Sequence, residues 1–127
     1  MMMLPEAVRI FVCTAPTDMR RSFDGLAAAV RRQLELDPES GALFLFINRR
    51  ANRAKLMWWD RTGYCLLYKR LEWGYFRRPL SLEPNGSHVT IDAVELAKIL
   101  EGVGLPPLKH RLRRQAVEEN ARQALHS

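Results

Sequence analysis

The chain has 127 residues, and its 20 Lys and Arg against 14 Asp and Glu give a formal net charge of +6. The hydrophobic fraction of 47% and the charged fraction of 27% are typical of a globular protein, which excludes a disordered or collagen-like chain. The length fits one domain and excludes a multidomain enzyme, and no apolar run approaches the roughly 20 residues of a membrane-spanning helix.

The N-terminal part of the chain predicts a strand followed by a helix. Residues 1–4 are too short for the apolar core of a signal peptide, so we expect a cytoplasmic protein whose Cys13 and Cys65 stay as free thiols. Residues 8–13 are β-branched and aromatic, as is typical of a strand. Ser22 fits the N-cap of a helix that runs to about residue 34.

The middle of the chain predicts three consecutive strands. Residues 43–47 form a continuous apolar run of strand length, and a polar loop over residues 48–53 follows it. Residues 54–59 and 64–70 predict two further strands. The sequence Asp60-Arg61-Thr62-Gly63 between them fits a four-residue hairpin turn.

The next part of the chain predicts a short edge strand, a loop and a second helix. Residues 75–77 are the edge strand, which Pro79 stops, and residues 80–88 are the loop. Asp92 is the expected N-cap of the helix, with Glu95 three residues later completing a capping box.

Together these elements predict an α+β fold. We expect a single domain over residues 1–106, in which an antiparallel β-meander packs against two helices. Residues 107–127 form a basic C-terminal tail that could be helical.

Positive charge is concentrated in two parts of the chain. Residues 41–80 carry nine basic and two acidic side chains, a net charge of +7, and residues 109–127 carry a net charge of +3. The commonest polyanionic partner of a small cytosolic protein is nucleic acid. A solvated face that keeps the protein soluble is the alternative reading of the same charge.

The predicted hairpin turn fixes which side chains share a face of the sheet. Side chains alternate with a period of two, so pairing Trp59 with Tyr64 also pairs Arg53 with Arg70 on the same face. The opposite face is almost wholly apolar, and we expect it to be the core side. Arg53 opposite Arg70 is a destabilising like-charge pair without a counter-anion, which a phosphate would supply.

These positions define the candidate nucleic-acid-binding residues. The predicted basic rim at one end of the sheet consists of Arg49, Arg50, Arg53, Lys55, Lys69 and Arg70. The aromatic side chains expected to stack on bases or sugars are Trp59, Tyr64 and Tyr68, unless they pack under a helix or the tail. The basic side chains of the tail that would extend this surface are Lys109, Arg111, Arg113 and Arg114.

The sequence gives no reason to expect an enzyme. The carboxylates Asp18, Asp24, Asp60 and Glu72 are the candidates for a nuclease site, but each has a simpler role in a turn, a helix terminus or an ion pair. No Cys or His spacing resembles a metal site, and the chain has no glycine-rich phosphate loop. We therefore predict no catalytic residue, no metal and no cofactor.

Several sequence blocks resemble one family of bacterial mobile-element proteins. Asp18-Met19-Arg20 and Phe23-Asp24-Gly25-Leu26 match its D-M-R-x-x-x-D-G-L opening, and Asn48-Arg49-Arg50, Trp58-Trp59-Asp60 and Lys69-Arg70-Leu71-Glu72 match later blocks. The chain resembles the TnpB (Orf2-like) accessory proteins of the IS66 class of insertion sequences over residues 5–103. Trp73 and Arg78 depart from the pattern of that family.

The resemblance implies a small accessory protein encoded beside a separate, larger transposase. Its expected partners are DNA at the ends of the element, the transposase itself and, through self-association, a second copy. A rival hypothesis is an adaptor that docks the transposase without contacting DNA. The apolar tail residues that would make such a contact are Leu108, Leu112, Val117, Ala121 and Leu125.

Overall fold

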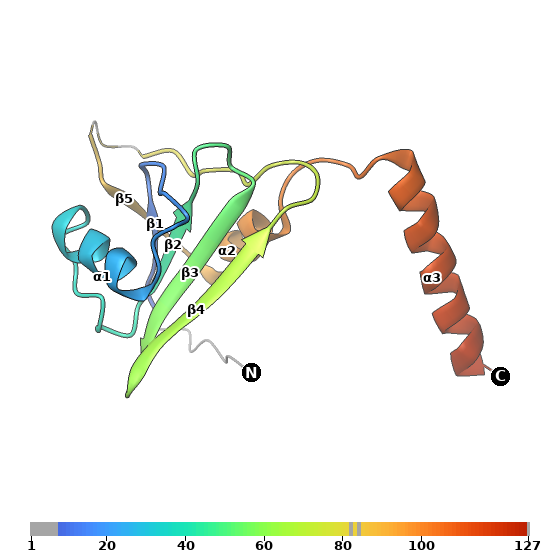
Figure 1. Cartoon of the computed structure of the whole chain (residues 1–127), viewed down its shortest axis with the longest axis horizontal. Helices are drawn as coiled ribbons and strands as arrows, with labels where there is room; N and C mark the ends of the chain where they lie inside the picture. Colours follow the sequence, from blue (N-terminus) through green and yellow to red (C-terminus); the bar gives the residue numbers. More distant parts are fainter. Residues whose placement is uncertain (1–7, 82, 84, 127) are drawn as a thin grey trace.

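The computed structural model describes residues 8–81, 83 and 85–126 as a five-stranded mixed sheet with three helices (Figure 1). The elements are β1 (Ile10–Cys13), α1 (Phe23–Arg32), β2 (Leu43–Ile47), β3 (Arg53–Asp60), β4 (Gly63–Arg70), β5 (His88–Ile91), α2 (Ala93–Glu101) and α3 (Leu108–His126). The strand order is β4-β3-β2-β1-β5. The α+β class is confirmed.

The sheet is not the strict antiparallel meander that the sequence predicts. β2, β3 and β4 are antiparallel neighbours, as expected. β1 and β2 are parallel, because α1 carries the chain back between them as a crossover connection. β5, for which the sequence predicts no strand, pairs antiparallel with β1. All four residues of β1 are buried, so the backbone N–H and C=O groups on both edges of this strand need hydrogen-bond partners, which β2 and β5 supply.

The predicted register of the β3–β4 hairpin is confirmed. Trp59 lies opposite Tyr64 and Arg53 lies opposite Arg70. The expectation that only one face of this hairpin adjoins a core is wrong, because Met57, on the predicted solvent side, is fully buried.

Helices cover both faces of the sheet, so the domain has two cores. One core lies under α1 and includes Phe44 and Phe46, and the other lies under α2 and includes Leu45 and Leu56. All five residues of β2 are buried. An uninterrupted apolar strand is typical of a sheet that is covered on both sides.

The segment after β4 forms a single bridge instead of the predicted edge strand. Tyr75 and Val103 donate backbone N–H groups to each other's carbonyl oxygens, at 2.9 and 2.8 Å. This bridge places Phe76 in the α2-side core, where its side chain is 1% exposed. Gly74 enters the bridge with φ +79°, a conformation that L side chains rarely adopt.

Replacing Gly74 by Ala lowers the free energy of unfolding by about 2 kcal/mol, because the backbone is left-handed there and the new Cβ would run into the carbonyl oxygen of Val103. Urea denaturation measures the loss. Gly63→Ala is the matched control, since its Cβ meets open space, and we expect a change within about 0.5 kcal/mol. Equal losses in the two variants would contradict the strain at Gly74.

The two C-terminal helices differ in how they are held. α2 begins at Asp92, whose side chain accepts a hydrogen bond of 2.8 Å from the Glu95 N–H, as the capping box predicts. α3 stands apart from the sheet (Figure 1), and every α3 side chain that the structure describes is exposed. Leu112 and Val117 lie about 140° apart around this helix, so the apolar tail residues form two short faces instead of one stripe.

Candidate nucleic-acid interface

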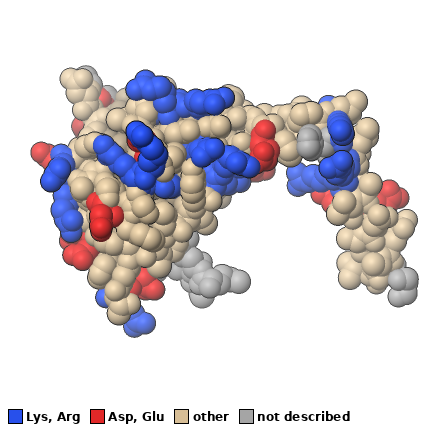
Figure 2. Space-filling model, in the orientation of Figure 1, with Lys and Arg blue, Asp and Glu red and all other residues tan. Residues whose placement is uncertain are grey.

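A groove of about 640 Å³ lies at the end of the sheet, between the β2–β3 loop and the segment that precedes α1. Its lining residues are Pro16, Thr17, Asp18, Met19, Arg20, Asn48, Arg49, Arg50, Asn52, Arg53 and Tyr68. Figure 2 shows Lys and Arg side chains gathered over this end of the molecule and over the first half of α3. The groove therefore brings part of the predicted rim together with Arg20, which the rim did not include.

The β2–β3 loop is organised by the side chain of Asn48. Its Oδ1 accepts hydrogen bonds of 3.0 Å from the backbone N–H groups of Asn52 and Arg53, and its Nδ2 donates to Asn52 Oδ1 at 2.8 Å. Ala51 takes a φ of +55° at the tip. Since the backbone is fixed by these bonds, the exposed Arg49 and Arg50 project from a defined turn.

Arg78 and Phe76 tie this loop to the segment after β4. The Phe76 N–H donates to the carbonyl oxygen of Ala51 at 2.6 Å, and Arg78 Nη2 donates to the carbonyl oxygen of Asn48. Burial, together with the nearby charge of Arg49, lowers the pKa of Arg78. Arg78 therefore helps to fix the β2–β3 loop through its bond to the backbone of Asn48. It stands at a position where the chain departs from the family pattern.

Lys55 lies inside the protein, which corrects its predicted place on the exposed rim. Lys55 is only 5% exposed. Nζ donates to the carbonyl oxygens of Met19 at 2.8 Å and Arg21 at 2.6 Å, and lies 4.7 Å from the centre of the Tyr68 ring. Lys55 therefore holds the wall of the groove that precedes α1, instead of facing a ligand.

Lys69 and Arg70 also have partners within the protein. Lys69 Nζ donates to the carbonyl oxygen of Leu100 at 2.6 Å, near the C-terminus of α2, where a positive charge complements the helix dipole. This contact corrects the predicted place of Lys69 on the same rim as Arg53. Arg70 forms an exposed ion pair with Glu72 at 2.8 Å, so its positive charge is partly offset.

The three predicted aromatic residues separate into two groups. Trp59 and Tyr64 contact each other edge to face, with ring centres 5.0 Å apart, and Tyr64 packs against the α1-side core. Burial raises the pKa of Tyr64. Tyr68 alone lines the groove; it is 47% exposed, and its hydroxyl accepts a hydrogen bond of 3.1 Å from Arg53 Nη1. Only Tyr68 is therefore placed to stack on a base in the groove.

The tail places its basic side chains on an exposed helix. Lys109, Arg111, Arg113 and Arg114 are all exposed on the first turns of α3. Arg114 Nε contacts Glu118 Oε1 at 3.1 Å, one turn further along. None of these residues lines the groove.

Asp18 and Arg20 form a fixed pair on the groove wall that precedes α1. Arg20 donates from Nε to Asp18 Oδ1 and Oδ2 at 3.1 and 3.0 Å, and from Nη2 to Oδ2 at 2.6 Å. These bonds lower the pKa of Asp18 from 3.8 to about 2 and raise the pKa of Arg20. The prediction of phosphate-binding residues missed this pair, although the i, i+2 spacing of opposite charges was a local signal.

Replacing Arg20 by Met raises the pKa of Asp18 from about 2 toward 3.8, because its main hydrogen-bond donor is lost. Since the pKa is depressed in the folded protein, the carboxylate stabilises the fold fully above pH 3.8 and loses that effect as the pH falls through about 2. A carboxyl-carbon NMR titration gives the midpoint. Arg21→Met is the control and should move the midpoint less, because Arg21 acts on Asp18 only through its charge; equal shifts would contradict the assignment.

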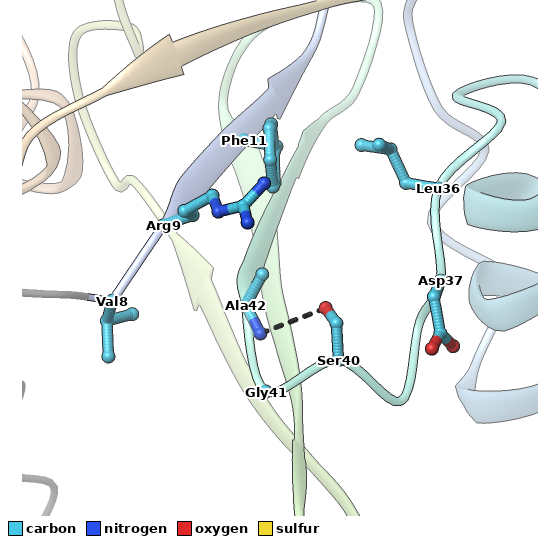
Figure 3. A pocket seen from close by; sticks show the side chains of 8 residues that line it. All are labelled: Val8, Arg9, Phe11, Leu36, Asp37, Ser40, Gly41 and Ala42. Carbon is cyan, nitrogen blue, oxygen red and sulfur yellow. Dashed lines mark hydrogen bonds between the residues drawn. The ribbon is translucent and has the colours of Figure 1, made fainter.

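A second pocket, of about 540 Å³, lies at the other end of β1 (Figure 3). Arg9 and Asp37 are its charged lining residues, and Ser40 Oγ accepts a hydrogen bond of 3.3 Å from the Ala42 N–H. Its two charges are of opposite sign, so it presents no net charge to a polyanion. In the part of the chain that the structure describes, no three His, Cys, Asp or Glu side chains group as metal ligands, and no helix could cross a membrane.

The mixed sheet and the arginine-lined groove define a small, basic α+β domain protein. The model of the family described as IS66 Orf2 like protein matches residues 8–110, and the chain belongs to this family. The resemblance seen in the sequence blocks is thereby confirmed, and the family points to an accessory role in the movement of an insertion sequence. Most of α3 lies beyond the matched residues.

Two proteins of Sinorhizobium fredii (strain NGR234) are similar to the chain. The uncharacterized protein y4hO is 38% identical over 103 residues, which cover 80% of this chain and 87% of y4hO. The uncharacterized protein y4jC is 42% identical over 74 residues, which cover 58% of this chain and 63% of y4jC. No solved structure matches the chain.

Proposed function

We propose that this IS66 Orf2-like protein is a non-enzymatic, cytoplasmic accessory factor of transposition that binds DNA in the groove beside the β2–β3 loop. Arg49, Arg50 and Arg53 would contact phosphates, Tyr68 would pack against a base or sugar, and the basic start of α3 would extend the contact as an arm. The proposed partners are DNA and the transposase of the same element.

The observation that carries this proposal is the unmatched positive charge of the β2–β3 loop. Arg49 and Arg50 are exposed, and among the described residues neither they nor Arg53 forms an ion pair. Arg53 also lies directly opposite Arg70 in the sheet. Because a rigid turn holds these like charges together, the end of the sheet is electrostatically incomplete without an anion.

Equilibrium binding by fluorescence anisotropy tests the proposal. The probes are a duplex from a terminal repeat of the element, a scrambled duplex and a single strand. With Lys55 and Lys69 bound within the protein and Arg70 paired with Glu72, about three phosphate contacts remain for the groove (Arg49, Arg50 and Arg53). Log K should therefore fall against log salt with a slope of about −2.7 on duplex DNA. Contacts by the α3 arm would make the slope steeper than this value. Deletion of residues 107–127 should then return the slope to the value expected for the groove alone. An absence of binding to all three probes at about 50 mM salt would overturn the proposal.

Docking to the transposase is the second candidate function, and the exposure of α3 favours it. Leu108 and Leu125 are 61% and 83% exposed at opposite ends of this helix. A protein with residues 107–127 deleted should keep the DNA affinity of the groove and lose binding to the transposase. If the deletion variant keeps both its affinity for DNA and its binding to the transposase, the tail has no role in either function.

A further inference from the structure

The Asp18–Arg20 pair leaves one edge of the Arg20 guanidinium free. Asp18 occupies the edge made by Nε and Nη2, through three contacts of 2.6 to 3.1 Å. A guanidinium has five N–H groups in a rigid plane, so the edge made by Nη1 and the second hydrogen of Nη2 remains. The Arg20 side chain is 90% exposed, and no bond from Nη1 to a described residue is present.

The backbone holds this pair in place as well. The Arg20 N–H donates to Asp18 Oδ1 at 2.9 Å, and the Arg21 N–H donates to the carbonyl oxygen of Asp18 at 3.2 Å, which closes a tight turn. Lys55 anchors both sides of this turn through the carbonyl oxygens of Met19 and Arg21. The free edge of Arg20 is therefore presented from a wall that is attached to the buried sheet.

The charge of the pair distinguishes it from the other arginines of the groove. Asp18 is ionised at neutral pH, so Asp18 and Arg20 together carry no net charge. A phosphate approaching Arg20 would also meet the carboxylate. The pair therefore contributes little to the attraction of a polyanion, but it keeps two parallel N–H donors at a fixed angle.

We propose that Arg20 is a specificity residue that recognises a guanine base in the DNA held by the groove. Its free edge matches the O6 and N7 acceptors of guanine in a bidentate contact. The free lone pairs of Asp18 can accept from an amino group on a neighbouring base, such as cytosine N4. Arg49, Arg50 and Arg53 on the facing wall bind the phosphates, so this inference rests on the proposed function.

Selection from random pools of duplex and single-stranded DNA tests the inference, with wild type and Arg20→Lys compared. Lysine keeps a positive charge but has no planar pair of donors. We expect guanine to be enriched at one or more positions by the wild type, and that enrichment to be weaker in Arg20→Lys, whose ammonium can still donate to guanine but not from a fixed planar pair. Affinity for the enriched sequence should fall about ten- to a hundredfold in the variant. Comparing the two pools shows whether the guanine is read in a duplex or in a single strand.

Base analogues in the enriched sequence identify the atoms that are read. Replacing the guanine by 7-deazaguanine removes N7 and should weaken binding by the wild type more than binding by Arg20→Lys. Inosine keeps O6 and N7 and should bind the wild type as guanine does. Asp18→Asn leaves Arg20 charged but unfixed, and should raise nonspecific binding while reducing the guanine preference.

The outcomes separate this inference from the proposed function. Binding of the wild type without guanine enrichment would overturn the role of Arg20 and leave the DNA-binding proposal standing. A guanine preference of the same strength in Arg20→Lys as in the wild type would also overturn it. Absence of any DNA binding by the wild type would overturn both.

Discussion

Replacing Arg49, Arg50 and Arg53 together by Gln lowers the affinity for duplex DNA about a hundredfold at roughly 0.15 M salt. Each phosphate contact contributes about 0.9 to the dependence of log K on log salt, so three lost contacts take the slope for the groove from about −2.7 to near zero. Scrambled and terminal-repeat duplexes should lose affinity alike, since phosphates carry no sequence information. Anisotropy titrations at several salt concentrations measure both quantities.

A control with the same change of charge separates contact from net charge. Arg9, Arg31 and Arg32 are exposed at the opposite end of the sheet, because β1 and β2 run parallel toward the groove and α1 runs back between them. Replacing these three by Gln removes the same charge but should leave the slope within about half a unit of wild type. Equal effects of the two triple variants would mean that the affinity for DNA depends on the overall charge of the protein and not on contacts in the groove.

Local patterns in the sequence predict the hairpin and α2 because their causes are local. A period of two and a four-residue turn fix the β3–β4 pairing, and Asp92 with Glu95 fixes the start of α2. The exposed arginines of the β2–β3 loop are predicted for the same reason. A polar loop between two buried strands lies at the protein surface, so Arg49 and Arg50 are expected to be exposed.

The remaining features depend on contacts between distant parts of the chain. Whether β1 lies parallel to β2 depends on where α1 packs, which the period of its apolar residues does not reveal. Lys55 alternates onto the predicted rim face, but α1 and the segment before it cover that face. The carbonyl oxygens that bind Lys55 come from Met19 and Arg21, more than 30 residues earlier in the chain.

Replacing Lys55 by Met lowers the free energy of unfolding by about 3 kcal/mol, because two carbonyl oxygens lose a charged donor at a buried site. Met has a similar length, so the packing beside Tyr68 is kept. For a domain of this size we expect a decrease in Tm of about 10 °C, measured by circular dichroism. The protein should still fold, since native domains are stable by about 5–15 kcal/mol.

The same variant distinguishes a structural lysine from a DNA-binding one. Lys55→Met should keep the salt slope of the wild type. Arg49→Gln should make the slope shallower by about one unit and leave the Tm unchanged. Lys69→Met is the matched lysine control: Lys69 makes one bond, to the carbonyl oxygen of Leu100, so we expect a loss of about 1 kcal/mol and no change of slope. If Lys55→Met has the stability of the wild type and a shallower salt slope, then Lys55 contacts DNA, and its role as the anchor of the groove wall is contradicted.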